Sequence, residues 1–525
     1  MNARRLVPLL AALFALVAAG PAAAAERIVR FDPKQTTRAE LRTTLAQRGL
    51  AAAPLKRLPF AAVVGDAQAL RGLAGVRGVT GTWTNDRLQW HLFESANLVF
   101  GGAARRAAAY QAGLDGSGQN VAIVDSGVDS THLDIQKRIV QNVKVVGVDG
   151  VGGIEGVFHH YVECGTTPCP GDTTSGHGTH VASTAAGDGT ASDGFYTGVA
   201  PGAGIVGIGT GEAIAVFHAL QAFDYLLSHP ELNVVAVNNS WGPNGGGRFD
   251  ATHPVNVATR KLHDAGIAVV FAAGNSDFGG EDGTEPGEPE GSSDCSPEAG
   301  ENGEECAINP YGTAPWAIGV AATRKDFDGG PGDQPLAVFS SRGDDDPQPS
   351  ADGSMTISYM PTLAAPGVNI KAARAPSGAT QLTCGGSAEP SSCVGPKPEY
   401  DAFYFSSSGT SMAAPHVTGA IAVIQDAAVT RLGHKLTPDQ VKQLLVQTAT
   451  PMTKVDGWWD FPCDSPVFVA CGGDVGGTTG APYAPWQVGA GAMNLGAALD
   501  AIAAGRVPPD SGKTKKPKKP KRIRG

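Results

Sequence analysis

Runs of apolar residues alternate with amphipathic segments between about residue 115 and residue 500. Five runs rich in Val, Ile and Ala each end in Gly or polar residues; they cover 120–127, 203–211, 233–242, 267–275 and 314–322. Segments with apolar residues at helical spacing, such as 212–229 and 255–266, lie between them. Continuous apolar strands alternating with helices are typical of a parallel sheet buried on both faces. The pattern predicts a doubly wound, mostly parallel α/β domain over residues 105–505, with functional groups at the carboxyl ends of its strands.

A shorter pattern precedes this domain. Residues 27–31, 61–66 and 76–83 form strand-like apolar runs, and residues 37–49 and 66–75 have helical spacing and end at Gly. Three strands and two helices in so short a stretch predict a small α+β module over residues 26–100, with one sheet face covered by helices.

Both ends of the chain have a composition of their own. Residues 1–25 start with two arginines, continue with an apolar run and end in alanines, which predicts a signal peptide and a secreted protein. No later apolar run reaches the roughly 18 residues that a spanning helix needs, so we expect no membrane span. Residues 506–525 form a basic tail, expected to be disordered, that either aids solubility or is attracted to anionic surfaces.

Charge is distributed unevenly along the chain. The net charge is −10, and without the eight Lys and Arg of 511–525 and the two arginines of the leader the remainder carries about −20. An acidic body argues against nucleic-acid binding. Residues 276–305 hold eleven acids without periodicity, which predicts a surface loop. This acidic insertion is either a solvated loop, a calcium-binding loop or a determinant of preference for basic substrates.

Eight cysteines fall into four neighbouring pairs in Gly- and Pro-rich loops. In an exported protein such pairs favour disulfides closed locally, although eight cysteines allow about 105 pairings. A metal site with His159 and His160 is the alternative for the first pair. The expected bridges are Cys164–Cys169, Cys295–Cys306, Cys384–Cys393 and Cys463–Cys471.

A serine-rich segment, Ser406–Val417, holds a candidate nucleophile that needs a base and an orienting carboxylate. Asp125 ends the first apolar strand, and His177 lies in a Gly-rich stretch that leads into a helix. Asn275 ends another strand, where its amide can donate to an oxyanion. Four side chains at element ends therefore form one candidate set for acyl transfer.

The choice among the serines depends on where the helix begins. Pro415 is tolerated only in a first turn, so Ser411 is expected at the helix entrance, where free N–H groups favour an anionic transition state. Residues 406–408 precede Gly409 and are expected to be polar strand or loop residues. Ser411 is therefore the predicted nucleophile.

The motifs VAIVDSGVDSTH, GHGTHVA, NNSWG, AAGN and GTSMAAPHV, in this order, resemble those of subtilisin-like serine proteases (subtilases). The resemblance implies a serine endopeptidase that forms an acyl-enzyme on Ser411, with His177 as general base and acid, Asp125 as orienter and Asn275 as oxyanion donor. It also implies that Ser240, Trp241 and Gly242 pair with the substrate backbone.

The same resemblance implies roles beyond the active site. Residues 26–100 resemble an inhibitory propeptide, and the substrates would be proteins or peptides. Catalysis would need no cofactor, and a structural Ca²⁺ is compatible with the family; Gly343–Pro347 and the acidic insertion are candidate ligand segments. Two alternatives remain: a peptidase with an acidic (sedolisin-type) triad, and a surface-binding protein that uses the basic tail on a protease-like scaffold.

Overall fold

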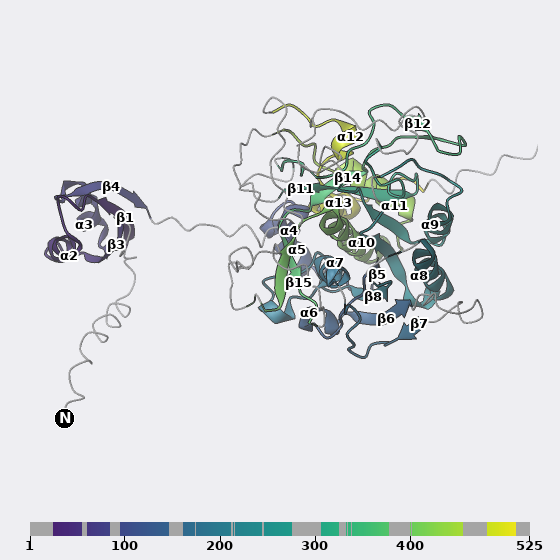
Figure 1. Cartoon of the computed structure of the whole chain (residues 1–525), viewed down its shortest axis with the longest axis horizontal. Coiled ribbons are helices and arrows are strands. Elements are labelled where there is room, and N and C mark those ends of the chain that lie inside the picture. Colours follow the sequence, from purple (N-terminus) through teal and green to yellow (C-terminus); the bar gives the residue numbers. More distant parts are fainter. Residues whose placement is uncertain are drawn as a thin grey trace, which may run out of the picture. The chain divides into compact units, whose positions relative to one another are not determined.

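The computed structural model describes residues 25–54, 60–84, 95–145, 161–173, 175–211, 214, 216–243, 246–275, 306–324, 332, 334–337, 339–376, 400, 402–454 and 480–510. The chain forms two compact units, Met1–Gln89 and Trp90–Gly525 (Figure 1). The signal peptide apart from Ala25, the acidic insertion and residues 511–525 of the basic tail lie outside the described residues.

The first unit is an antiparallel sheet with helices on one face. Its strands follow the order β2-β3-β1-β4, and their bounds are β1 (Ala25–Phe31), β2 (Ala51–Pro54), β3 (Phe60–Gly65) and β4 (Val79–Thr84). The helices are α2 (Arg38–Ala46), α3 (Ala67–Arg71) and the short η1 (Leu73–Gly75). Alternate residues of β1 and β3, such as Val29 and Val63, pack with Leu41 and Leu45 in one core. The predicted α+β architecture is confirmed, with β2 as an unpredicted fourth strand.

The second unit contains an eight-stranded sheet in the order β14-β11-β10-β9-β5-β8-β6-β7. All neighbouring strands are parallel except β6 and β7. The strand bounds are β5 (Asn120–Asp125), β6 (Ile139–Val145), β7 (Tyr161–Glu163), β8 (Gly204–Gly209), β9 (Val234–Asn239), β10 (Ala268–Ala272), β11 (Ala317–Thr323) and β14 (Leu363–Pro366).

Helices cover both faces of this sheet. Their bounds are α4 (Ser95–Val99), α5 (Ala103–Gln111), α6 (Leu133–Gln136), α7 (His177–Ala186), η4 (Thr190–Ser192), α8 (Val216–Ser228), η5 (Pro230–Leu232), α9 (Pro254–Asp264), α10 (Thr410–Leu432), α11 (Pro438–Thr448), α12 (Pro485–Val488) and α13 (Leu495–Ala503). Val121 and Ile123 of β5 pack in a core with α7, α10, α11 and α13. Ala122 and Val124 pack with α8 and α9 on the other face. The predicted doubly wound fold is confirmed.

The strand order places β5 at a reversal of the winding. The chain proceeds from β5 to β6 and β8 on one side of it, and then crosses to β9 on the other side. In sheets of this kind, ligands bind outside the carboxyl ends of the strands at such a point. Asp125 is the last residue of β5 and therefore lies at this point.

Two short hairpin-like sheets complete the unit: β12 (Gln348–Pro349) with β13 (Thr356–Ile357), and β15 (Ile370–Ala373) with β16 (Tyr404–Ser407). β16 leads directly into α10, whose N-cap residue is Gly409. Ser411 is the second residue of this helix, so the predicted helix entrance is confirmed. Pro415, however, is the sixth residue and lies inside α10, not in its first turn. Side-chain contacts described below explain why the helix tolerates it.

Close packing of α10 on α7 depends on Gly419. A Cβ at this position would lie 2.5 Å from the Ala185 carbonyl oxygen and 2.9 Å from the Val199 Cβ. We expect Gly419→Ala to destabilise the fold by about 1–3 kcal/mol, because the helices must separate. Thermal unfolding measures the effect, and Val429→Ala, at a 42% exposed position of the same helix, is the control. Equal melting temperatures for both variants would contradict the expectation.

The first predicted disulfide is present: Cys164 and Cys169 are bonded, with 6.3 Å between their Cα atoms. Cys306 is also disulfide-bonded. Its predicted partner Cys295, together with Cys384, Cys393, Cys463 and Cys471, lies outside the described residues. No helix in the described part of the chain is both long and apolar enough to span a membrane.

Candidate active site

Asp125 and His177 are in direct contact although 52 residues separate them. The His177 Nδ1 atom lies 2.6 Å from Asp125 Oδ1, and the side chains are 22% and 4% exposed. A carboxylate only accepts hydrogen bonds, so Nδ1 carries the proton and Nε2 is left as the basic atom. Asp125 Oδ1 also accepts the backbone N–H of Ser126 at 2.8 Å. The pair therefore has the orientation that a general base requires.

The protonation of His177 is controlled by its neighbours. Burial lowers its pKa, but the charge and hydrogen bond of Asp125, with a further contribution from Asp172, outweigh burial and raise the pKa above 6.5. His180 lies one turn further along α7 and is fully buried, with Nε2 at 2.9 Å from the Ile370 carbonyl oxygen. Burial lowers the pKa of His180 to about 3, so this residue stays neutral.

Ser411 is linked to the end of β9 by two reciprocal hydrogen bonds. Its hydroxyl donates to the Ser240 carbonyl oxygen at 3.0 Å. The Ser240 hydroxyl donates to the Ser411 carbonyl oxygen at 2.8 Å. Pro415 has no N–H with which to bond that carbonyl, four residues earlier in the helix. Ser240 supplies the missing donor, which explains how α10 accommodates an internal proline.

Asn275 is held against the first turn of α10. Its Oδ1 accepts the Thr410 backbone N–H at 2.9 Å and the Thr410 hydroxyl at 2.8 Å. Because the amide oxygen faces Thr410, the Nδ2 group is the donor left for another acceptor. Thr410 is fully buried, and its hydroxyl also accepts the Gly274 N–H at 3.1 Å. Two donors from Thr410 thus fix the orientation of an amide beside Ser411.

The predicted substrate-pairing residues follow β9 directly. The Trp241 indole donates to the Val124 carbonyl oxygen at 2.9 Å and packs edge-on against Phe271 at 5.3 Å. This side chain is therefore anchored in the fold, and contact with a substrate would fall to the backbone. Asn309 braces the same segment by donating to the Trp241 carbonyl oxygen at 2.9 Å. Pairing of Ser240–Gly242 with a substrate stays a prediction.

Several residues that organise the site were not identified from the sequence. Thr410 had a signal, since it directly precedes the predicted nucleophile. Asn309 had none, because it follows an insertion and only the fold brings it beside Trp241. Asp172 likewise had no signal, although it lies five residues before His177. Buried polar residues of this kind are recognisable only by the partners that the tertiary structure supplies.

The described residues contain no group of three or more His, Cys, Asp or Glu side chains arranged as a metal site. In the candidate segment Gly343–Pro347, Asp344 Oδ1 accepts the Asp346 N–H at 2.9 Å and so closes a turn. The acidic insertion lies outside the described residues, and structural calcium stays a prediction.

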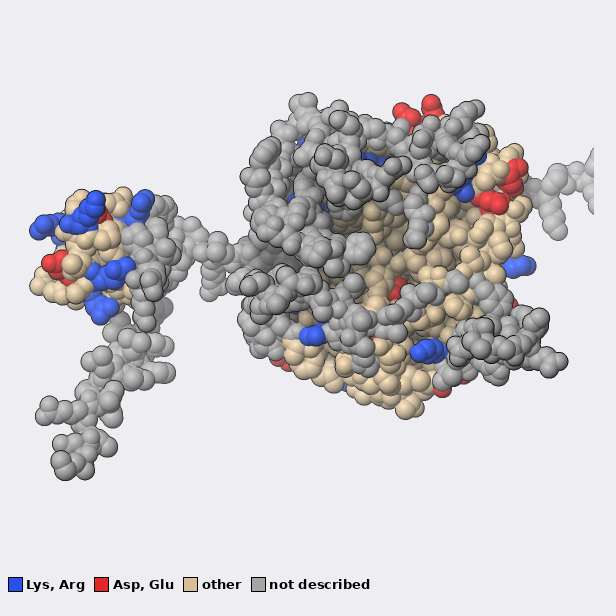
Figure 2. Space-filling view, viewed as in Figure 1, with Lys and Arg blue, Asp and Glu red and all other residues tan. Residues whose placement is uncertain are grey.

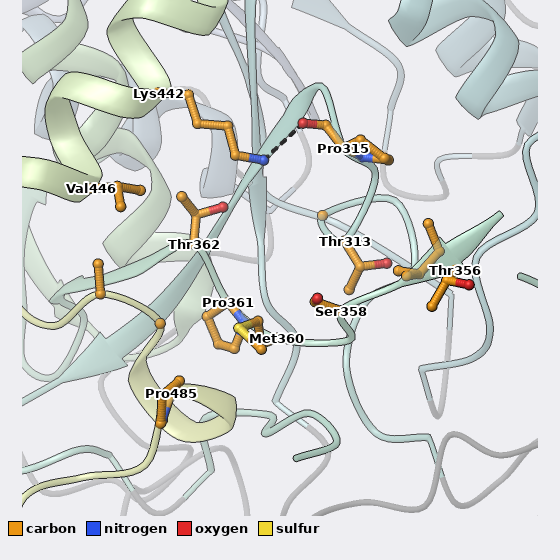
Figure 3. A pocket seen from close by; sticks show the side chains of 14 residues that line it. Thr313, Pro315, Thr356, Ser358, Met360, Pro361, Thr362, Lys442, Val446 and Pro485 are labelled. Atoms are coloured by element: carbon orange, nitrogen blue, oxygen red, sulfur yellow. Dashed lines mark hydrogen bonds between the residues drawn. The ribbon is translucent and has the colours of Figure 1, made fainter. Parts of the chain in front are cut away.

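A separate cavity of about 560 Å³ lies near the amino ends of β11 and β14 (Figure 3). Pro315 and Thr362 line it, and they precede β11 and β14, whereas Asp125 is the last residue of β5. Lys442 donates to the carbonyl oxygens of Pro315 at 3.0 Å and Ala317 at 2.5 Å. Burial lowers the Lys442 pKa to about 8. None of the predicted site residues lines this cavity.

These features define a doubly wound protein with an Asp125–His177 pair and with Ser411 in the first turn of α10, and the chain belongs to the subtilase family. The family match, Peptidase_S8, covers residues 116–466. The resemblance predicted from the five motifs is thereby confirmed.

The chain is also similar to individual known proteases. The chain is 29% identical to serine protease AprX of Bacillus subtilis (strain 168) over 341 residues, which are 63% of this chain and 61% of that protein. It is 28% identical to subtilisin of Bacillus sp. (strain TA39) over 320 residues, 59% of this chain and 57% of that protein. A solved structure titled S41 Psychrophilic Protease is 24% identical with a TM-score of 0.43, covering 64% of this chain and 84% of that chain. The chain thus spans about three fifths of these two relatives' lengths.

Proposed function

We propose that this protein is a secreted serine endopeptidase that hydrolyses peptide bonds through an acyl-enzyme on Ser411. The observation that carries the proposal is the 2.6 Å contact between His177 and Asp125, at the point where the winding of the sheet reverses. Family membership and the similarity to serine protease AprX support the same activity.

The proposed reaction assigns one step to each group. Ser411 Oγ attacks the peptide carbonyl carbon while its proton passes to His177 Nε2, and Asp125 stabilises the imidazolium that forms. Asn275 Nδ2 donates to the oxyanion of the tetrahedral intermediate. His177 then protonates the leaving amine, and water, deprotonated by His177, hydrolyses the acyl-enzyme. Before attack, the Ser411 hydroxyl must exchange its bond to Ser240 for one to His177, a change typical of unliganded sites.

The acidic-triad alternative is less well supported. Such a mechanism needs a carboxylate as its general base, whereas here the imidazole of His177 contacts Asp125 through Nδ1. A peptidase of that class would keep its activity in a His177→Ala variant and work best at strongly acid pH. Loss of activity in that variant across the pH range would therefore separate the two mechanisms.

A serine-directed phosphonate tests the proposed function directly. We expect the purified, processed protein to lose peptide hydrolysis in step with formation of one covalent adduct, mapped by mass spectrometry to Ser411. The adduct should form slowly or not at all in a His177→Ala variant, because the hydroxyl then lacks its base. Inactivation without labelling of Ser411 would contradict the proposal, as would labelling at Ser406–Ser408.

We further propose that the module predicted over residues 26–100 inhibits the catalytic domain until it is removed; α4 (Ser95–Val99), which packs in the core of the second unit, would stay with the catalytic domain. Opposite charges support this proposal: residues 25–84 contain ten Lys and Arg against four Asp and Glu, whereas residues 85–510 contain 20 against 46. Figure 2 shows Lys and Arg side chains at several places on the first unit's described surface. An unprocessed chain as active as the processed one would contradict this role.

The proposal also includes secretion, a structural calcium ion and a surface-binding role for the basic tail. The leader composition supports secretion, and the disulfide Cys164–Cys169 suits an oxidising compartment. A structural Ca²⁺ would stabilise the fold without taking part in the reaction. The basic tail would attract anionic surfaces independently of catalysis, so its deletion should change surface retention and leave peptide hydrolysis intact.

A further inference from the structure

A second buried carboxylate lies beside the Asp125–His177 pair. Asp172 is fully buried in the loop before α7. Its Oδ1 accepts the Gly176 N–H at 3.1 Å and the Ser126 hydroxyl at 3.2 Å. Its Oδ2 accepts the backbone N–H of Thr179 at 3.1 Å and the Thr179 hydroxyl at 2.8 Å. These four groups all donate to the carboxylate, as an ionised carboxylate requires.

Asp172 caps the N-terminus of α7, because the N-cap residue of this helix has no capping side chain. The N-cap residue of α7 is Gly176, which has no side chain and is in a left-handed conformation with φ of 78°. The first N–H groups of a helix have no partner within the helix. The N–H of the third helical residue normally donates to the side chain of the N-cap residue. Thr179 occupies that position, and Asp172 accepts its N–H from outside the helix. The carboxylate therefore fixes the turn whose first residue is His177.

Ser126 connects this carboxylate to the catalytic pair. Its backbone N–H donates to Asp125 Oδ1 at 2.8 Å, and its hydroxyl donates to Asp172. The same hydroxyl accepts the N–H of Gly178, the residue after His177, at 2.9 Å. One residue thus contacts both carboxylates and the backbone of the histidine turn.

The three backbone segments that meet here are packed without room for side chains. A Cβ on Gly127 would lie 2.1 Å from the Gly171 carbonyl oxygen, and one on Gly178 would lie 2.1 Å from the Gly127 carbonyl oxygen. The disulfide loop that precedes Asp172 is also tied down, since the Cys169 N–H donates to the Ser130 hydroxyl at 2.8 Å. Asp172 is therefore held on a rigid support.

We propose that Asp172 is a positioning residue of the reaction: it holds Ser126 and the first turn of α7 so that Asp125 and His177 stay in contact, and it adds a second negative charge close to His177. This inference rests on the proposed peptidase function. It extends the catalytic arrangement by a residue that does not touch the substrate.

The charges around His177 agree with this role. Asp125 on β5 and Asp172 in the preceding loop both raise the pKa of His177 against the effect of burial. His180, on the same helix, is uncharged because burial lowers its pKa to about 3. His416 on α10 has Nδ1 at 2.8 Å from the Met412 carbonyl oxygen. Asp172 is thus the second anion that stabilises the imidazolium.

The pH profile of kcat/KM in an Asp172→Asn variant tests the proposal. His177 acts as a base in its neutral form, and removing a nearby negative charge favours that form. We therefore expect the acid limb to move to lower pH by roughly 0.5–1 unit. We also expect kcat to fall by about tenfold. The two donors to one carboxylate oxygen would face the amide NH₂ group of the new asparagine, so the first turn of α7 would be held less firmly.

Asp134→Asn is the matched control. Asp134 is also fully buried, and its carboxylate accepts the Ala191 N–H at 2.7 Å and the Tyr404 hydroxyl at 2.7 Å. Burial raises the pKa of both Asp134 and Asp172, and in both residues the hydrogen bonds to the carboxylate oppose this effect. We expect this variant to lose stability without a shift of the acid limb. An equal shift in both variants, or no shift in Asp172→Asn, would overturn the proposal.

Ser126→Ala keeps the proposal testable if Asp172→Asn does not fold. This variant cuts the link to Asp172 but retains its charge, so kcat should fall by about three- to tenfold with the acid limb unchanged. A wild-type kcat in Ser126→Ala would overturn the positioning role. Failure of the proposed function gives a different result, namely hydrolysis that persists in Ser411→Ala.

Discussion

Ser411→Ala is expected to lower kcat for peptide hydrolysis by about 10⁶-fold, a magnitude established for subtilisin, a relative of this chain. Without the hydroxyl no acyl-enzyme forms, and His177 has no proton to accept. The fold should be unaffected, because among the described residues the variant loses only the bond from the Ser411 hydroxyl to Ser240, whereas the Ser411 carbonyl keeps its bond from the Ser240 hydroxyl. Hydrolysis of a chromogenic peptide by the processed protein measures the loss.

Two further variants give this prediction its controls. Ser406→Ala, in β16, should keep wild-type kcat, because its side chain precedes the helix that carries the nucleophile. The double variant Ser411→Ala/His177→Ala should lose little more than Ser411→Ala alone, since the two groups act as one unit. Losses that multiply in the double variant would show that His177 acts independently of Ser411.

Asn275→Leu is expected to lower kcat by roughly 10²–10³-fold, about 2.7–4 kcal/mol of transition-state stabilisation, with KM little changed. Leucine has a similar shape but no donor for the oxyanion. Because the charge on that oxygen develops only in the transition state, the effect should fall on kcat. Steady-state kinetics on one peptide substrate separate the two constants. A rise in KM at constant kcat would instead assign Asn275 to ground-state binding.

Thr410 variants test whether the amide must be oriented. Thr410→Val removes the hydroxyl that donates to Asn275 Oδ1 at 2.8 Å but leaves the backbone bond at 2.9 Å. We expect a kcat loss smaller than that of Asn275→Leu, and near wild-type kcat in Thr410→Ser, which retains a hydroxyl. Equal losses in Thr410→Val and Thr410→Ser would mean that packing of the methyl group, not the hydrogen bond, matters.

The elements of the fold were predictable because their signals are local. The run Asn120–Asp125 is apolar at every interior position, as a strand buried on both faces must be. Thr437, Pro438 and Gln440 have the composition of a typical helix start, and the structure has a capping box there, at the start of α11. Strand order was not predictable, because pairing depends on contacts between distant segments.

The residues of the candidate active site also fall into predictable and unpredictable groups. Asp125, His177, Asn275 and Ser411 were identified from motifs, since acyl transfer restricts both the residue types and their neighbours. The residues that hold them were not: Asp172 is an ordinary loop aspartate until the fold places Ser126 and Thr179 around it. Pro415 was placed in the wrong turn, because only the structure reveals that Ser240 bonds to the carbonyl the proline leaves free.

The sequence by itself determined the class of fold, the subtilase family and the four residues with candidate chemistry, because hydrophobic periodicity and reactive side chains are properties of short segments. Only the tertiary structure decided which strand ends meet, that His177 Nδ1 faces Asp125, and that Thr410, Ser240 and Asp172 hold the site. The physical reason is that a buried polar group is stable only with its hydrogen-bond partners. Here those partners come from segments that are far apart in the chain.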